Sequence, residues 1–456
     1  MRTARILPVV AVLLVAAALA GEKKVAGLFA PSRLQTASGE LAKPESFYEA
    51  ADCGECHVDQ YREWKGSAHS RAHHDGIYRA FAELARKEAG EELYRFCSSC
   101  HAPLAVATGE IGKKGEATFL TDEGVTCDVC HNVRDIQLIH NSAGKNASII
   151  LEEGDVRYGP LENPVENPAH KSALSRIHAR SELCSSCHTL VHPHNGLVIE
   201  NTYEEWRVSP YAKAGINCRD CHMRTVDQAL ETAKKMQVIQ VPGRTTDTDK
   251  RPDVKVHNFV GANTNQKAVG LGEAHAAEAK KRLQTATSIA LELPANTPAG
   301  SPAKIVVAVT NVAAGHAIPT SITELRQVWI DLHVTTSDGK TVYRSGAIDG
   351  TGRVDPDAVM YHSVLVDAEG KVTYKPWKAV KMVKEKVIPP KSTVRETFEV
   401  SVPADTAGEL VVKCVLRYRS APQEVMDRLF GKGKFDIDIV DMASTEARLA
   451  VGKAAK

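Results

Sequence analysis

The chain has 456 residues, of which 43% are hydrophobic, 25% charged and only 5% aromatic, and its formal net charge is +1. This length accommodates two or three domains, and the composition is that of a folded soluble protein rather than a disordered one. The near-neutral charge, without a basic tract, excludes nucleic acid as an expected partner. So few aromatic side chains suggest that something else helps to fill the interior.

An export signal is predicted for residues 1–20. Arg2 and Arg5 give it a positively charged start, the apolar stretch 6–20 is short for a membrane span, and residues 18–20 (Ala-Leu-Ala) resemble a cleavage site. An uncleaved N-terminal anchor is the alternative. Cleavage would leave 55 basic and 56 acidic side chains. We therefore expect a periplasmic or extracellular protein without stable membrane insertion.

Five copies of the motif Cys-x-x-Cys-His contain ten of the eleven cysteines. Their cysteines are Cys53, Cys56, Cys97, Cys100, Cys127, Cys130, Cys184, Cys187, Cys218 and Cys221, and their histidines are His57, His101, His131, His188 and His222. This motif attaches c-type haem, because two thiols bond one porphyrin edge and the adjacent imidazole binds the iron as proximal ligand. Zinc sites and disulfides also use paired cysteines but do not require histidine at this offset. The sequence predicts five covalently attached haems c.

Residues 45–265 are predicted to form one pentahaem domain, made mainly of short helices and loops. The motifs leave about 34 residues per haem, too few for an ordinary apolar core, so the haems themselves should fill the interior. Electrons could then hop along a row of adjacent porphyrins. Apolar spacing predicts helices over 45–69 and 77–93, and composition predicts loops over 104–124 and 141–169.

The C-terminal part has a different pattern. Residues 266–286 are predicted as a linker helix, after which the sequence alternates with period two and is rich in Val, Ile and Thr. The expected strands are 288–293, 304–311, 326–336, 341–345, 395–402 and 410–419. We predict an antiparallel β-sandwich over residues 287–450, and hence an α+β multidomain fold. Cys414, the odd cysteine, is expected to be a buried strand residue.

The second axial position on each iron decides whether a haem only carries electrons. A histidine there closes the site, whereas an open position permits substrate binding. Thirteen histidines remain after the five proximal ones, so most haems are expected to be bis-histidine. The candidate distal ligands are His69, His73, His170, His257 and His316. His69 is favoured over His73, His178 is a rival of His170, and His192 is expected to be a surface or packing residue.

The stretch from Cys53 to His69, including Tyr61 and Trp64, resembles the cytochrome c-554 family of multihaem cytochromes. Residues 124–131 and 204–223 are also similar to that family, and the resemblance covers about 45–265. It implies haems packed in parallel and perpendicular pairs, electron shuttling for redox enzymes such as those of hydroxylamine oxidation, and an axial role for His69. The familiar member has four haems, whereas this chain has five motifs and an added β domain.

Three functions are therefore open at this stage. The leading hypothesis is an exported pentahaem electron carrier between redox partner proteins. The second is an oxidoreductase with one open haem that acts on a small nitrogen or sulfur compound; the histidine at the end of all five motifs, where related reductases often have lysine at the active haem, counts against it. The third is a subunit of a larger multihaem assembly, in which case an oligomer would be expected.

Overall fold

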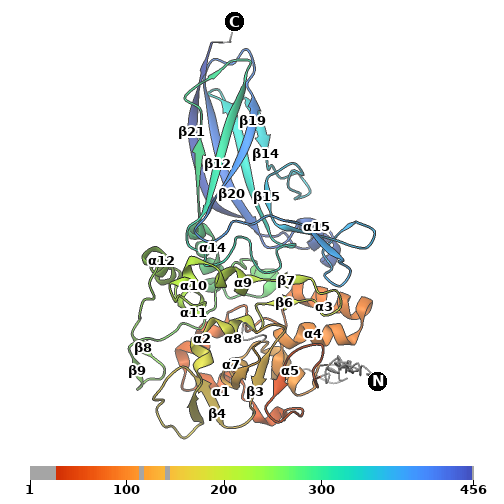
Figure 1. The fold of residues 1–456 in the computed structure, drawn as a ribbon, viewed down its shortest axis with the longest axis vertical. Coiled ribbons are helices and arrows are strands. Elements are labelled where there is room, and N and C mark those ends of the chain that lie inside the picture. The colour runs from red at the N-terminus through yellow and green to blue at the C-terminus, as the bar shows by residue number, and fades with distance from the viewer. Residues whose placement is uncertain (1–26, 112–117, 139–143, 454–456) are drawn as a thin grey trace, which may run out of the picture.

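The chain folds into a helical N-terminal part and a β-rich C-terminal part, as the computed structural model shows for residues 27–111, 118–138 and 144–453. In Figure 1 the short helices gather at one end and the long strands extend away from them. The fold class is α+β, as predicted. In these ranges no helix has the length and apolar character that a membrane span needs. The predicted export signal, residues 1–20, lies outside the described residues.

The N-terminal part is built from short helices and small sheets. Its helices are α1 (Ala50–Gly54), α2 (Val58–Lys65), α3 (Gly76–Ala89), α4 (Glu91–His101), α5 (Pro103–Ala107), α6 (Phe119–Asp122), α7 (Cys127–His131), α8 (Ser181–Ser185), α9 (Thr202–Arg207), α10 (Pro210–Lys213), α11 (Arg219–His222) and α12 (Val226–Lys235). Its strands are β1 (Gln35–Thr36), β2 (Val133–Ile136), β3 (Ile149–Leu151), β4 (Val156–Gly159), β5 (Lys171–Leu174), β6 (Leu190–Val191), β7 (Val198–Glu200), β8 (Gly243–Arg244) and β9 (Lys250–Arg251).

The helix predicted over 77–93 is two helices, α3 and α4. Asp75 caps α3, because its Oδ1 accepts hydrogen bonds from the backbone N–H of Ile77 and Tyr78 at 2.8 and 3.1 Å. Gly90, with φ 96°, ends the helix in a conformation that only glycine adopts without strain. The apolar spacing continues across this break, which is why the sequence alone does not reveal it.

The connection to the C-terminal part is also broken by glycine. The linker helix predicted over 266–286 consists of α13 (Gln266–Val269) and α14 (Glu273–Ala286). Gly270 adopts a left-handed conformation, with φ 76°, and terminates α13. Helix α14 then packs against the last strand, β21 (Val440–Gly452), and so joins the two parts of the chain.

Two large sheets and one small sheet form the C-terminal part. The strands are β10 (Thr287–Glu292), β11 (Thr297–Pro298), β12 (Pro302–Asn311), β13 (Gln327–Thr336), β14 (Thr341–Ser345), β15 (Met360–Tyr361), β16 (Ser363–Val366), β17 (Val372–Thr373), β18 (Lys381–Glu385), β19 (Thr393–Ser401), β20 (Gly408–Arg419) and β21, with helix α15 (Gln423–Phe430) before β21. One antiparallel sheet has the order β10-β12-β19, and the larger has the order β11-β21-β20-β13-β14, with β15 also paired to β13. A small third sheet, β17-β16-β18, lies outside both.

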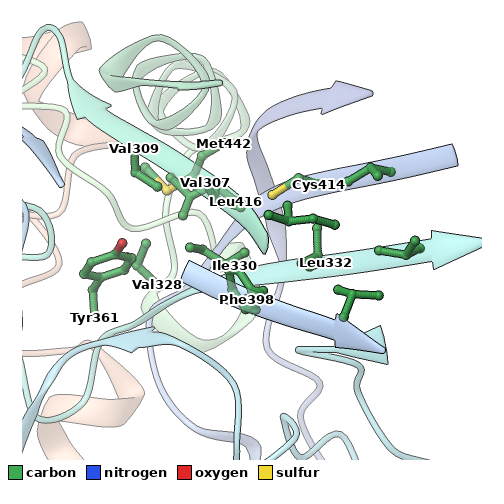
Figure 2. Close-up of a cluster of buried hydrophobic side chains, with 14 of the residues drawn as sticks. Val307, Val309, Val328, Ile330, Leu332, Tyr361, Phe398, Cys414, Leu416 and Met442 are labelled. Atoms are coloured by element: carbon green, nitrogen blue, oxygen red, sulfur yellow. The ribbon is translucent and has the colours of Figure 1, made fainter. Parts of the chain in front are cut away.

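Apolar side chains from both large sheets share one core. Val307 on β12 and Phe398 on β19 pack with Ile330 on β13 and Leu416 on β20 (Figure 2). Each fully buried side chain of this kind contributes roughly 1.5–3 kcal/mol to stability. Cys414 on β20 is fully buried in the same cluster, as its strand setting predicted. The β-rich part therefore has an apolar core independent of any cofactor.

Candidate haem-binding site

A single large cavity runs through the helical part and reaches the C-terminal part. Its volume is about 2000 Å³, well above the roughly 300–1,000 Å³ of an ordinary small-molecule pocket. All ten motif cysteines and all five motif histidines line it. The cavity therefore has the wall chemistry that several haems c require, and it accounts for an interior with few aromatic side chains.

Each motif is held in a helical turn. The backbone N–H of His57, His188 and His222 donates to the carbonyl of the first cysteine of its own motif at 2.9 Å in every case. This hydrogen bond joins residues four positions apart, as in an α-helix, and puts the first cysteine and the histidine on one side of the turn. The spacing of the motif thus presents thiol and imidazole to the same space.

Backbone carbonyls orient four of the proximal imidazoles. The Nδ1 atoms of His57, His101, His131 and His222 lie 2.6–2.9 Å from the carbonyl oxygens of Thr245, Ala72, Tyr158 and Val260, respectively. Because a carbonyl only accepts, each Nδ1 must carry the proton, and Nε2 is left with its lone pair toward the cavity. This is the arrangement that holds a metal-binding histidine in one tautomer.

Four of the five proximal imidazoles face another histidine across the cavity. The ring centroids are separated by 6.3 Å for His57 and His170, 6.0 Å for His131 and His178, 6.3 Å for His188 and His69, and 6.1 Å for His222 and His316. A metal–imidazole bond is about 2.0 Å long, so two imidazoles on one metal have centroids on the order of 6 Å apart. The four gaps therefore have room for one iron each.

Burial keeps two of the facing histidines neutral. It lowers the pKa of His69 to about 3 and that of His178 to about 4. A buried imidazole loses hydration that only its charged form needs, so the neutral form, which binds iron, is favoured at every physiological pH.

His101 of the second motif has a different neighbour. The ring of Tyr78 stacks on it, with 3.7 Å between centroids and 7° between planes. In the part of the chain that the structure describes, no histidine ring faces His101 at the spacing of the other four pairs. Burial raises the pKa of Tyr78 well above its ordinary value, so its phenol stays protonated. The second motif is thus the one whose iron would lack an evident distal histidine.

The remaining candidates take other positions. His257 places Nδ1 3.0 Å from the Lys255 carbonyl and its ring edge-on to Phe259, 5.7 Å between centroids. His73 is buried with no hydrogen-bond partner on either ring nitrogen, and does not line the cavity. His192, expected at the surface or in packing, is buried, lines the cavity and has neither ring nitrogen paired. The only feature of the sequence that hints at a place for His192 in the cavity wall is its position near the fourth motif.

Contacts between thiols show which motifs are neighbours. Three pairs of cysteines from different motifs are near enough for the thiols to shift each other's pKa: Cys53 with Cys127, Cys100 with Cys187, and Cys184 with Cys218. The indole Nε1 of Trp64 also donates to the Val125 carbonyl at 2.8 Å, which ties the region after the first motif to the third. The first motif therefore adjoins the third, and the fourth adjoins both the second and the fifth.

Two carboxyl groups lie where the helical part meets the C-terminal part, and one of them, Glu324, lines the cavity. The Glu205 carboxylate of α9 accepts from the Ala317 N–H at 3.0 Å and from the Thr320 hydroxyl at 2.7 Å, and burial raises its pKa to about 7. Glu324, just before β13, is 2% exposed, has no hydrogen-bond partner on either oxygen, and has its pKa raised by burial to about 8. The cavity wall is therefore polar at this end.

Comparison with known proteins agrees with this arrangement. A penta-heme cytochrome c552 from Thermochromatium tepidum has a similar fold, with a TM-score of 0.61 and 20% sequence identity over 89% of this chain and 100% of that one. A CARDB domain of the PF1109 protein from Pyrococcus furiosus matches 36% of this chain and 87% of its own length, at 10% identity and a TM-score of 0.16. A search of curated proteins finds no match.

The fold is similar to that of a penta-heme cytochrome c, and the cavity is lined by five haem-attachment motifs. Residues 52–132, which include the first three motifs, match the family described as cytochrome c554 and c-prime. This match confirms the resemblance to the cytochrome c-554 family over residues 52–132 of the 45–265 for which it was expected. An electron-transfer cytochrome with haem c is the function that the family and the fold support.

Proposed function

We propose that the chain is an exported pentahaem electron carrier that passes electrons between redox partner proteins. The observation that carries this proposal is that all five motifs open onto one continuous cavity. Bound haem would supply the one-electron iron couple. The chain's own groups hold it: the thiols anchor the porphyrin edges, the imidazoles take the axial positions, and the backbone carbonyls fix the imidazole tautomer.

The ring pairs support a specific set of distal ligands. His170, His178, His69 and His316 are proposed to close the haems of the first, third, fourth and fifth motifs, respectively. His73 and His257 are proposed to be packing residues. His170 and His178, weighed in the sequence as rivals for one site, are then ligands of two different haems.

The proposal also includes the domain limits and the location of the protein. The domain limits are 45–265 for the pentahaem part and 287–450 for a β-sandwich, whose shared core between two sheets supports that description. The location is outside the cytoplasm, since haem c is attached there and an export signal is predicted. The four in-chain histidine pairs make a ligand borrowed from a second chain unnecessary at those sites.

A second function is favoured by one observation, the stacking of Tyr78 on His101 without a facing imidazole. An open iron at the second motif could bind a small nitrogen or sulfur compound, and this would make the chain an oxidoreductase. The phenol of Tyr78, 3.3 Å from the Ser98 hydroxyl, is a protonated group beside that haem.

Electron paramagnetic resonance of the oxidised holoprotein tests both functions. We expect four low-spin haems and one high-spin haem, and a reductive titration that takes up five electrons per chain. An electron count other than five would contradict the pentahaem proposal. Five low-spin signals would remove the oxidoreductase candidate, whereas a high-spin signal that shifts on adding nitrite or hydroxylamine would favour it over a plain carrier.

A further inference from the structure

The small sheet β17-β16-β18 carries an unusual concentration of positive charge. Between residues 371 and 386 there are six lysines and one acidic residue, Glu385, in a chain whose net charge is only +1. Two of the lysines are neutralised, since Lys375 pairs with Glu88 and Lys386 with Glu396, both at 2.6–2.8 Å. The other four, Lys371, Lys378, Lys381 and Lys384, are exposed.

Strand register places lysines and valines on one face of this sheet. Val366 pairs with both Val372 and Lys381, and Val364 pairs with Lys384, and directly paired residues share a face. The opposite face, with Leu365 and Met382, packs into the molecule. The outward face thus carries Lys381 and Lys384 beside Val364, Val366 and Val372.

The valines of this region are unusually exposed. Val372, Val380 and Val383 have exposed fractions of 61, 56 and 51%. Protein–protein interfaces combine exposed apolar groups with charged ones, and both occur here side by side. We call the set Lys371, Val372, Lys378, Val380, Lys381, Val383 and Lys384 the lysine–valine surface.

The segment behind the lysine–valine surface reaches the second motif. Trp377, in the connection between β17 and β18, lines the cavity and packs in one cluster with Cys97. Its ring also lies edge-on to Phe81 of α3, 6.5 Å between centroids. A partner seated on this surface would therefore be close to the haem that Cys97 anchors.

The same segment is firmly attached. The indole Nε1 of Trp377 donates to the Glu88 carboxylate at 2.9 Å. The Asn195 side chain donates to the carbonyls of Pro376 and Ala379, both at 2.8 Å. A surface held by α3 and by the β6–β7 turn needs little ordering when a partner binds, which lowers the cost of association.

We propose that the lysine–valine surface is the docking site for an acidic redox protein, which exchanges electrons with the haem of the second motif. This inference rests on the proposed function and adds the partner's chemistry and the point of electron entry. Unpaired lysines attract a negatively charged face and speed its encounter, most strongly at low ionic strength. One electron moves from the partner's reduced centre to a ferric haem, or in the reverse direction, and no bond is formed.

Stopped-flow reduction of the oxidised holoprotein by an acidic plant-type [2Fe–2S] ferredoxin tests the proposal. The Lys381→Glu/Lys384→Glu variant should be reduced about tenfold more slowly than the wild type at low ionic strength. The matched control is Lys213→Glu/Lys234→Glu, which changes the net charge equally at exposed positions of α10 and α12 and should slow reduction much less. The difference should vanish at about 1 M salt, where the Debye length is about 3 Å.

Other outcomes would overturn the docking site. Equal slowing of the two variants would mean that only net charge matters, and no slowing would mean that the lysines merely protect sheet edges. Loss of binding to phosphatidylserine vesicles with an unchanged ferredoxin rate would assign the surface to a membrane. Dithionite reduction of all haems in every variant separates these results from a failure of electron transfer itself. Carbodiimide cross-links from ferredoxin should fall on the four exposed lysines, and cross-links elsewhere would contradict the site.

Discussion

Replacing His316 with alanine should convert the haem of the fifth motif from low to high spin. His316 lies in the loop between β12 and β13, and its ring faces that of His222, 6.1 Å between centroids and 16° between planes. Removing the imidazole leaves the iron of that haem with His222 alone. One haem in five should therefore become high-spin in addition to the one expected at the second motif, as electron paramagnetic resonance would measure.

The loop is held independently of His316, which makes the variant a clean test. The Asn311 side chain donates to the His316 carbonyl at 2.9 Å, and Glu205 accepts from the Ala317 N–H at 3.0 Å. Both bonds survive the substitution to alanine. The matched control is His257→Ala, another half-buried cavity histidine, which should leave the spectrum unchanged. A fully low-spin fifth haem in His316→Ala, or a new high-spin haem in His257→Ala, would refute the ligand assignment.

The difference between local and long-range information explains which haem contacts could be predicted. The cysteines and the proximal histidine of a motif lie within five consecutive residues, so their geometry follows from one helical turn and is visible in the sequence. The facing histidines are set by tertiary structure. His170 and His178 are eight positions apart yet face the first and third motifs, and His316 comes from the C-terminal part. No local pattern distinguishes them from His73 or His257.

The strands also divide into those that the local sequence predicts and those that depend on tertiary pairing. The six strands expected from period-two alternation all occur, and their ends agree with the prediction to within two residues. Strand β21 was missed, although its thirteen residues pair along most of β20. Six of its thirteen residues are Ala, Asp, Glu or Gly, which are depleted in strands, so pairing with a long neighbour rather than intrinsic preference makes it a strand. The short helices α5 and α6 in the predicted loop 104–124 are likewise stabilised by burial of Leu104 and Leu120.

Substituting Glu324 by glutamine should make the free energy of unfolding fall less steeply as the pH rises from 5 to 8. Burial raises the pKa of Glu324 from 4.5 to about 8, while nearby Arg326 opposes this shift and Glu200 adds to it. The folded chain therefore keeps the carboxyl protonated up to about pH 8, whereas the unfolded chain ionises it above pH 4.5. Because the folded pKa is the higher one, the contribution to stability is fully present below pH 4.5 and is lost as the pH rises through about 8.

The slope of this loss gives the measurement. Through Glu324, each pH unit between its two pKa values lowers the free energy of unfolding by about 1.4 kcal/mol. Glutamine, which does not ionise, should remove this part of the slope. Urea unfolding of the holoprotein at several pH values from 5 to 8 would compare wild type with Glu324→Gln. The control Glu369→Gln, at an exposed turn between β16 and β17, should keep the wild-type slope. If Glu324→Gln lost stability with rising pH as steeply as wild type, the Glu324 carboxyl would be ionised in the folded protein. The wall of the cavity before β13 would then have to be wetter or more positively charged than the buried, unpartnered oxygens of Glu324 indicate.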